Sequence, residues 1–262
     1  MVSKGAQSSR SNASIYRWVC RVLTKELHPE HVYKISDAKS AACANFLRLF
    51  LDSAGQIFTT NYDLLLYWVL MRQGTAQHID GFGRELENPL EVQRGEDEQW
   101  SDLIWGPNQS KQNIHYLHGA LHLFDAGSEI IKEQYDWTGY LLDHITNRLD
   151  EGSYPIFVTA GNGKEKLEHI RHNRYLSYCY DRLSNTEGSL VTFGFNFGPY
   201  DDHIIEAINR AAKHGVKVPD KLWSVYIGTY SDADIKHIES ILPKFEVKVQ
   251  LFDAKTANVW EA

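Results

Sequence analysis

The sequence predicts a single α/β domain built on a mostly parallel sheet with helices on both faces. From Pro155 onward, short apolar runs alternate with amphipathic segments, which is the pattern of strand and helix units in a parallel sheet. At 262 residues, with 43% hydrophobic and 23% charged residues, the chain can bury a core of ordinary composition. We expect residues 1–14 to form a disordered polar tail and residues 15–262 to form the domain.

In the N-terminal part, apolar residues at helical spacing predict helices over 15–27 and 38–51. A short buried strand, Ile57–Thr59, follows, and a helix is expected over 63–71. Ligands of open α/β sheets bind at the carboxyl ends of the strands, so Asn61 and Asp63 are well placed for polar recognition. Either side chain can also cap the helix, and this segment alone favours the cap.

A polar stretch at about 81–112 interrupts the pattern, with Trp100 and Trp105 as its large anchors. A loop of this length inside a compact domain is usually functional, for example a lid or a binding loop. Strand character returns over 113–124, broken at Gly119, and a helix is expected over 135–149.

The C-terminal part supplies the alternating units themselves. The expected strands are 156–158, 190–195, 222–227 and 245–252, and the expected helices between them are 164–183, 202–214 and 231–242.

Composition excludes several classes of protein. The net charge of −7 gives no basic footprint, so we expect no nucleic-acid partner. The three cysteines form no C-x-x-C pair, which favours a reducing cytoplasm. No apolar run approaches the roughly 18–20 residues that span a bilayer, and the N-terminus lacks a signal core. We therefore expect a cytoplasmic protein with no membrane association.

Three histidines, His115, His118 and His122, fall within one expected strand. His115 and His118 are an odd number of residues apart and point to opposite faces, so we expect no metal site. His118 is followed by Gly119, which lets a ligand or another backbone come close, and a neutral imidazole can accept a proton near pH 7. A general base and a hydrogen-bonded core histidine are equally compatible with this segment.

Several other turns follow strands. The segment 161–164 (GNGK) matches neither phosphate-loop pattern and is more typical of a helix start, although such a start can hold an anion. The segment 169–174 is more typical of a solvated helix face than of a phosphate-binding patch. The turn Phe193–Asp202 contains Gly194, Asn196 and Asp201, and its glycines allow the close approach of a nucleotide. The segment 228–232 repeats that arrangement one strand later.

Four segments in this order resemble the sirtuin-like superfamily, and more closely its bacterial members that were long labelled a domain of unknown function. They are Thr59–Asp63 (TTNYD), Asp80–Phe82 (DGF), Leu117–Gly119 (LHG) and the turn from Phe193 (FGF) to Asp201. The stretch 155–181 is also similar to that bacterial group, and the resemblance covers roughly residues 40–255.

The resemblance implies a Rossmann-like domain that binds NAD as its substrate and cleaves the bond between nicotinamide and ribose. Many bacterial relatives hydrolyse NAD as effectors of defence against phage. By this resemblance, Asn61 orients the ribose or the attacking water, Asp63 fixes the nicotinamide end, and His118 is the base. The remaining cofactor-binding residues would be Thr60, Gly119, Gly194, Asn196 and Asp201.

The chain departs from the superfamily at two points. No strand with a G-A-G-x-S-like or G-N-G-x-S-like turn precedes Thr59, so we expect the family's first strand and phosphate loop to be lacking. The paired C-x-x-C motifs of the sirtuin zinc ribbon are absent, which argues against a zinc-containing protein deacetylase. Two hypotheses stay open: an NAD-hydrolysing enzyme, and an inactive or truncated module for nucleotide binding or interaction. Either could form a homo-oligomer or bind a partner protein of a defence system.

Overall fold

The protein is described by a computed structural model that covers residues 35–75, 77–84, 102–135, 139–158, 161–213 and 221–260. The expected tail over 1–14, the expected helix over 15–27 and residues 85–101 of the polar stretch lie outside the described residues. The described part has the α/β class that the sequence predicts, with helices and strands that alternate along much of the chain.

The N-terminal elements lie close to where the sequence places them. Helix α2 (Asp37–Leu51) begins after Ser36, whose hydroxyl accepts a hydrogen bond from the backbone N–H of Lys39. Strand β1 (Ile57–Thr59) follows, and helix α3 (Leu65–Arg72) begins two residues later than expected. The hydroxyl cap and the apolar spacing together explain why α2 was predictable.

Two sheets of the structure are parallel. Strand β1 pairs in parallel with β4 (Ile114–Tyr116). The second parallel sheet has the order β10-β9-β8 and consists of β8 (Gly188–Thr192), β9 (Leu222–Thr229) and β10 (Lys248–Asp253). Helices α7 (Asp202–Lys213) and α8 (Asp232–Ile241) connect these three strands, as the alternating pattern predicts.

The largest described sheet is antiparallel, so the prediction of a mostly parallel sheet is wrong for this part of the molecule. Its order is β2-β3-β6-β5-β7. The polar stretch 81–112 contributes two of its strands, so it is not a plain loop. Strands β5 and β6 are joined by four residues, too few for a parallel crossover. The strands are β2 (Phe82–Gly83), β3 (Leu103–Trp105), β5 (Gly119–Asp125), β6 (Ile130–Lys132) and β7 (Pro155–Phe157).

The helix expected over 164–183 is two helices, α5 (Gly163–His172) and α6 (Arg174–Ser184). Asn173 separates them with an extended backbone, and its side-chain oxygen accepts from the first free N–H groups of α6. Helix α4 (Leu141–Asp150) begins six residues later than the expected 135–149. The apolar spacing runs through Asn173, so periodicity alone could not reveal the break.

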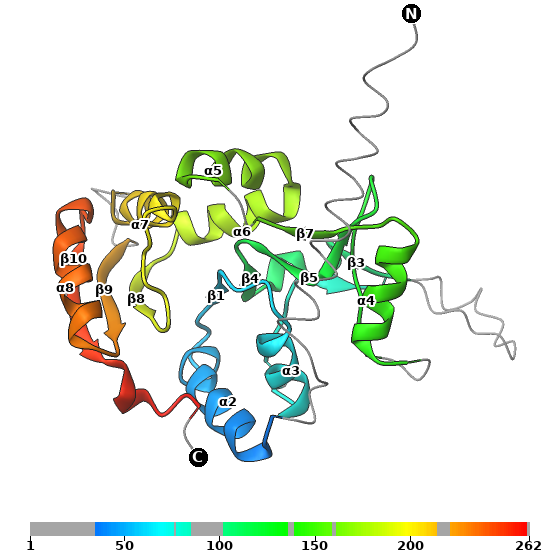
Figure 1. The fold of residues 1–262 in the computed structure, drawn as a ribbon, viewed down its shortest axis with the longest axis horizontal. Coiled ribbons are helices and arrows are strands. Elements are labelled where there is room, and N and C mark those ends of the chain that lie inside the picture. The colour runs from blue at the N-terminus through cyan, green and yellow to red at the C-terminus, as the bar shows by residue number, and fades with distance from the viewer. Residues whose placement is uncertain are drawn as a thin grey trace, which may run out of the picture.

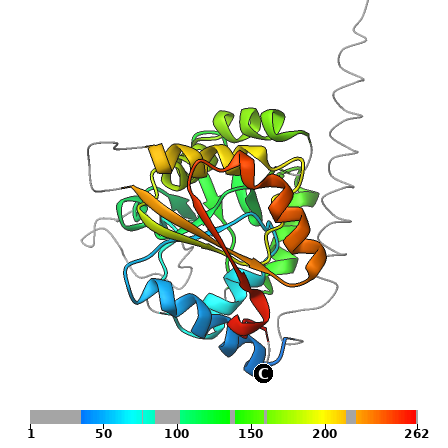
Figure 2. The same cartoon turned by 90° about the vertical axis from the view of Figure 1, so that its left-hand side faces the viewer.

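Helices cover the parallel strands from two sides. Helices α5, α6 and α7 lie on one side of the strands, and α2 and α3 lie on the other (Figure 1). Turned by 90°, the view shows β8, β9 and β10 side by side, with α7 above them and α2 below (Figure 2). One buried cluster joins α2, α6 and α7 to these strands, and a second lies around α3, α4 and β5. Among the described residues, no helix has the length and apolarity to cross a membrane.

Candidate functional site

A pocket of about 640 Å³ lies between β1 and β8. Its size is typical of a small-molecule site. Within the described residues, β1 pairs only with β4 and β8 only with β9, so each strand turns an edge without a described partner toward this pocket. The walls between the two edges are largely apolar and include Phe46, Leu47 and Phe58.

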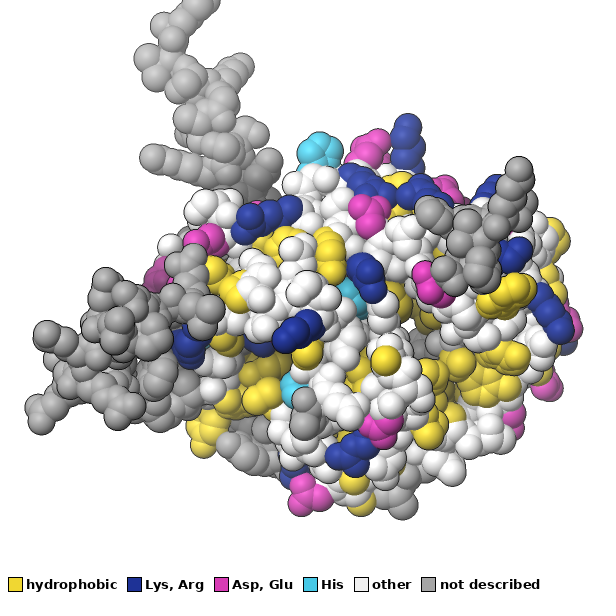
Figure 3. All heavy atoms as spheres, turned by 180° about the vertical axis from the view of Figure 1, so that it is seen from behind, with side chains coloured by type: hydrophobic (Ala, Val, Ile, Leu, Met, Phe, Trp, Pro, Cys, Tyr) yellow, Lys and Arg dark blue, Asp and Glu magenta, His cyan; other side chains and the backbone are white. Residues whose placement is uncertain are grey.

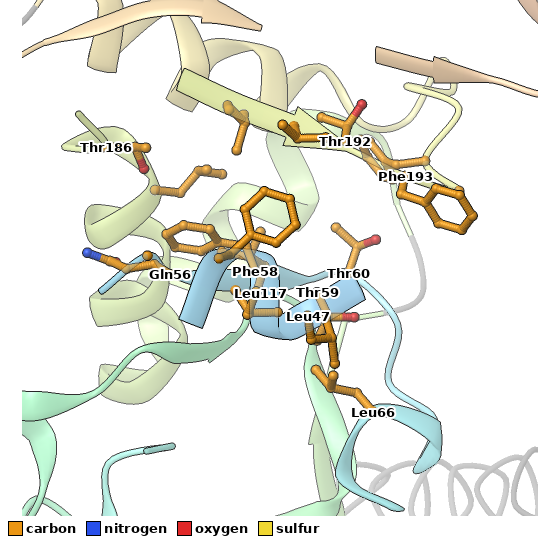
Figure 4. A pocket seen from close by; sticks show the side chains of 18 of the residues that line it. Leu47, Gln56, Phe58, Thr59, Thr60, Leu66, Leu117, Thr186, Thr192 and Phe193 are labelled. Atoms are coloured by element: carbon orange, nitrogen blue, oxygen red, sulfur yellow. The ribbon is translucent and has the colours of Figure 1, made fainter. Parts of the chain in front are cut away.

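The polar end of the pocket lies where both strands end. Thr60, Asn61 and Asp63 follow β1, Gly194 follows β8, and all four line the pocket. The close-up shows Thr60 near Thr192 and Phe193 at one end, with Gln56 and Thr186 at the other (Figure 4). These four predicted site residues are therefore brought together at the carboxyl ends of two parallel strands, where α/β proteins bind ligands.

The sequence allowed Asn61 and Asp63 either to hold the start of the next helix or to meet a ligand, and their contacts differ. Asp63 Oδ1 accepts from the backbone N–H of Leu65 at 2.9 Å, so Asp63 holds the start of α3. Burial raises the pKa of Asp63, and the hydrogen bond to Leu65 opposes that rise. The side chain of Asn61 is exposed in the pocket wall. Asn61 is therefore the residue of this pair that is free to meet a ligand.

His118 lies behind the pocket wall rather than in it. Its side chain is 5% exposed, and its imidazole forms a hydrogen bond with the backbone of Thr60, which does line the pocket. The Nε2 atoms of His118 and His203 are 2.8 Å apart, and the two rings are stacked. Burial lowers the pKa of each imidazole to about 4, so both are neutral at pH 7.

The tautomers of this pair follow from its hydrogen bonds. Two neutral imidazoles can share the contact only if one Nε2 carries a proton and the other accepts it. If the proton of His118 is on Nδ1, where it can face the Thr60 carbonyl, the Nε2 of His118 carries no proton and is the acceptor. His203 Nε2 is then the donor, and His203 Nδ1, which has no hydrogen-bond partner among the described residues, carries a lone pair.

An ion pair adjoins the two histidines. Asp201 Oδ1 accepts from Lys166 Nζ at 2.9 Å, and Asp201 opposes the lowering of the pKa of both His118 and His203. The sequence predicted Asp201 but missed His203 and Lys166. His203 lies in the first turn of α7, two residues after Asp201, and this closeness in the sequence was the available signal. Lys166 lies inside α5 and gave none.

Gly119 and Asn196 do not take the ligand-binding positions expected of them. Gly119 has a φ of +79°, and a Cβ there would lie 2.7 Å from the carbonyl carbon of Ile156, so the close approach is to β7. Asn196 does not line the pocket, and its backbone carbonyl accepts from His237 Nε2 at 2.9 Å. Gly194 differs from both, because it lines the pocket with a φ of +66° and open space around it.

The other two histidines of the strand segment are core residues. His115 is fully buried and stacks on Phe58, with ring centroids 4.8 Å apart. His122 is fully buried against Tyr67. The expectation of no metal site at this segment stays a prediction: His115 and His122 lie outside the group of described residues that could hold a metal ion, whereas His118 belongs to it.

The remaining turn segments are helix starts and an exposed face. Asn162 accepts from Lys164 and Glu165, and Glu165 accepts from Asn162, so a capping box occupies the N–H groups that an anion would need. Arg171 in the 169–174 segment binds Asp181 on the surface. On the face drawn in Figure 3, basic and acidic side chains are interspersed and form no continuous basic surface.

A family model described as "Domain of unknown function (DUF4917)" matches residues 14–260. No curated protein is similar enough to the chain to count as a match.

Proposed function

Because the chain belongs to the DUF4917 family, whose description gives no activity, we propose its function from the pocket itself: it binds NAD and hydrolyses the nicotinamide–ribose bond. One observation carries the proposal. The pocket joins the polar ends of β1 and β8, so that Thr60, Asn61 and Gly194 face one space while His118 lies directly behind Thr60. These are the segments on which the resemblance to the sirtuin-like superfamily rests.

The Rossmann-like architecture is part of the same proposal. The two parallel sheets, β4-β1 and β8-β9-β10, face each other across the apolar part of the pocket. One further parallel strand in that gap would join them into a single sheet of order β4-β1-x-β8-β9-β10. Parallel sheets are buried on both faces, and the walls of the gap are accordingly apolar. The strand would fill the apolar part and leave the polar end at Thr60 and Gly194 for the nucleotide.

The chemistry needs polar groups that do not carry a fixed charge. When the C–N bond to nicotinamide breaks, its electron pair leaves with nicotinamide and the ribose becomes an oxocarbenium-like cation. The Asn61 amide would orient the water that attacks the ribose carbon. As the new C–O bond forms, that water loses a proton, which the neutral His118–His203 pair would accept through a bridging water, because neither imidazole lines the pocket. The Asp201 carboxylate stabilises the resulting imidazolium. The products are nicotinamide and ADP-ribose.

The position of His118 restricts how the substrate can bind. Because the Thr60 backbone lies between the imidazole and the pocket, the ribose must bind at the end of the pocket beside Thr60. The adenosine part would then extend toward the turn after β8, where Gly194 leaves open space.

Variants at the two proposed catalytic positions test the proposal through nicotinamide release. We expect Asn61→Ala and His118→Gln each to lower the rate by at least about 100-fold. The matched controls, Asn147→Ala and His169→Gln, change exposed residues on α4 and α5 and should keep the wild-type rate. Equal rates for the catalytic and control variants would rule out these roles.

The alternative is a module that binds the nucleotide without cleaving it. That function predicts a rise in melting temperature with NAD and no product, because a ligand that binds only the folded state stabilises it. A cytoplasmic location and a role in defence against phage belong to the enzyme proposal. They rest on the cysteine usage and on the family resemblance, respectively.

A further inference from the structure

The histidine pair and the neighbouring Asp201 together have the donor atoms of a metal site. His118, His203 and Asp201 each offer one ligand atom, and these atoms all lie within 4.8 Å of one another. Both histidines are buried, while Asp201 is half-buried and keeps one side open toward solvent. Two imidazoles and a carboxylate, with a fourth position left open, form a common donor set for Zn²⁺.

The spacing of the two imidazoles fits a metal between them. With Zn–N bonds of about 2.0–2.1 Å, two tetrahedral ligands lie about 3.3 Å apart. The Nε2 atoms of His118 and His203 are 2.8 Å apart, so they would have to move about half an ångström farther apart to admit the ion.

Two further observations point to a ligand at this cluster. His203 is 1% exposed and its Nδ1 has no hydrogen-bond partner within the described part of the chain, so the ring proton can move from Nε2 to Nδ1 without breaking a hydrogen bond there and leave the Nε2 lone pair for the ion. His118 forms a backbone hydrogen bond with Thr60, the kind of outer contact that orients the histidine ligands of metals.

We propose that His118, His203 and Asp201 form a binding site for Zn²⁺ in which the ion replaces the hydrogen bond between the two imidazoles. Lys166 opposes this binding, because its ammonium group lies 2.9 Å from Asp201 Oδ1 and repels a cation bound at the same carboxylate. Lys166 and the metal therefore compete for Asp201.

The consequence for activity rests on the proposed function. Zn²⁺ would bind the Nε2 atoms of both imidazoles and so keep the pair from accepting the proton during hydrolysis, and the bound ion would inhibit NAD cleavage. Metal binding itself does not depend on that function and can be measured without NAD.

A Co²⁺ titration of the purified chain tests the site directly, since tetrahedral Co²⁺ absorbs strongly in the visible range. We expect the band in the wild type, and a loss of affinity of at least about 100-fold in His203→Asn, because a ligand contributes more than an outer-shell contact. The control, His169→Asn, makes the same change on the exposed face of α5 and should bind as the wild type does.

Lys166→Met keeps all three ligands and should tighten binding by at least about tenfold, because it removes a cation close to the ion. Because this expected change in metal affinity is opposite to that of His203→Asn, Lys166→Met tests the proposal even if His203→Asn does not fold. Wild-type affinity in both His203→Asn and Lys166→Met would overturn the site.

Zinc in the nicotinamide-release assay separates this inference from the proposed function. Co²⁺ binding with no NAD cleavage under any condition would leave the site standing and refute the enzyme. NAD cleavage that Zn²⁺ does not inhibit, at concentrations that saturate the Co²⁺ site, would refute the inhibitory role.

Discussion

Gly119 is the position at which a single methyl group should do most damage to the fold beside the site. Its φ of +79° costs an alanine about 1–2 kcal/mol. The added Cβ would also lie 2.7 Å from the carbonyl carbon of Ile156 and 3.0 Å from Cα of Phe157, and such overpacking costs about 1–3 kcal/mol. We therefore expect Gly119→Ala to lower the free energy of unfolding by about 2–5 kcal/mol.

The assay is thermal unfolding of Gly119→Ala beside Gly127→Ala. Gly127 has a φ of +85° but nothing within 4 Å of an added Cβ, so it carries the backbone cost without the clash. At about 2–4 °C per kcal/mol, Gly119→Ala should melt roughly 4–20 °C below the wild type, and Gly127→Ala, with the backbone cost alone, roughly 2–8 °C below. Equal shifts for the two variants would refute the close approach of β5 to β7.

Three further predictions concern buried groups. Burial lowers the pKa of His122 to about 3, so below about pH 6.5 the unfolded chain binds a proton that the folded chain does not. His122 should therefore lower the free energy of unfolding by about 1.4 kcal/mol per pH unit as the pH drops toward 3. Urea unfolding at several pH values should show a plot of this free energy against pH that is less steep by that amount in His122→Leu; parallel plots for the variant and the wild type would contradict it. Asp80→Asn leaves the half-buried Lys132 ammonium without its carboxylate partner and should cost about 3 kcal/mol of unfolding free energy, much of it recovered by adding Lys132→Met; no recovery in the double variant would show that the lost ion pair is not the cause. Burial raises the pKa of Cys43 to about 11 and of Cys179 to about 12, so in a Cys20→Ser variant neither thiol should react with iodoacetamide at pH 8 until the protein is unfolded; rapid alkylation of the native protein would count against their burial.

The predictable parts of the fold are those set by local pattern. Helices α2 and α7 follow from apolar spacing, and the strand that ends before Asn61 follows from an apolar run closed by a polar turn. The sequence allowed either Asn61 or Asp63 to cap α3; the N-cap position is Leu64, and Asp63 accepts instead from the backbone N–H of Leu65 just before the helix.

The unpredicted parts are a hairpin, a helix break and contacts between residues distant in the sequence. The antiparallel sheet arises because β5 and β6 form a hairpin, whereas the repeated strand and helix units suggested parallel pairing throughout. The break at Asn173 leaves no trace in the apolar spacing on either side. His203 and Lys166 lie 85 and 48 residues from His118 in the sequence, and only the packing of α5 and α7 brings their side chains to it.

Binding and cleavage of NAD in this pocket can be measured together in one experiment. Purified chain is incubated with NAD while nicotinamide and ADP-ribose are quantified and the melting temperature is followed in the same samples. We expect equal amounts of the two products, and we expect Asn61→Ala to abolish both without changing the melting temperature of the free protein, because Asn61 is exposed. Intact NAD together with an unchanged melting temperature would contradict both binding and catalysis at this site.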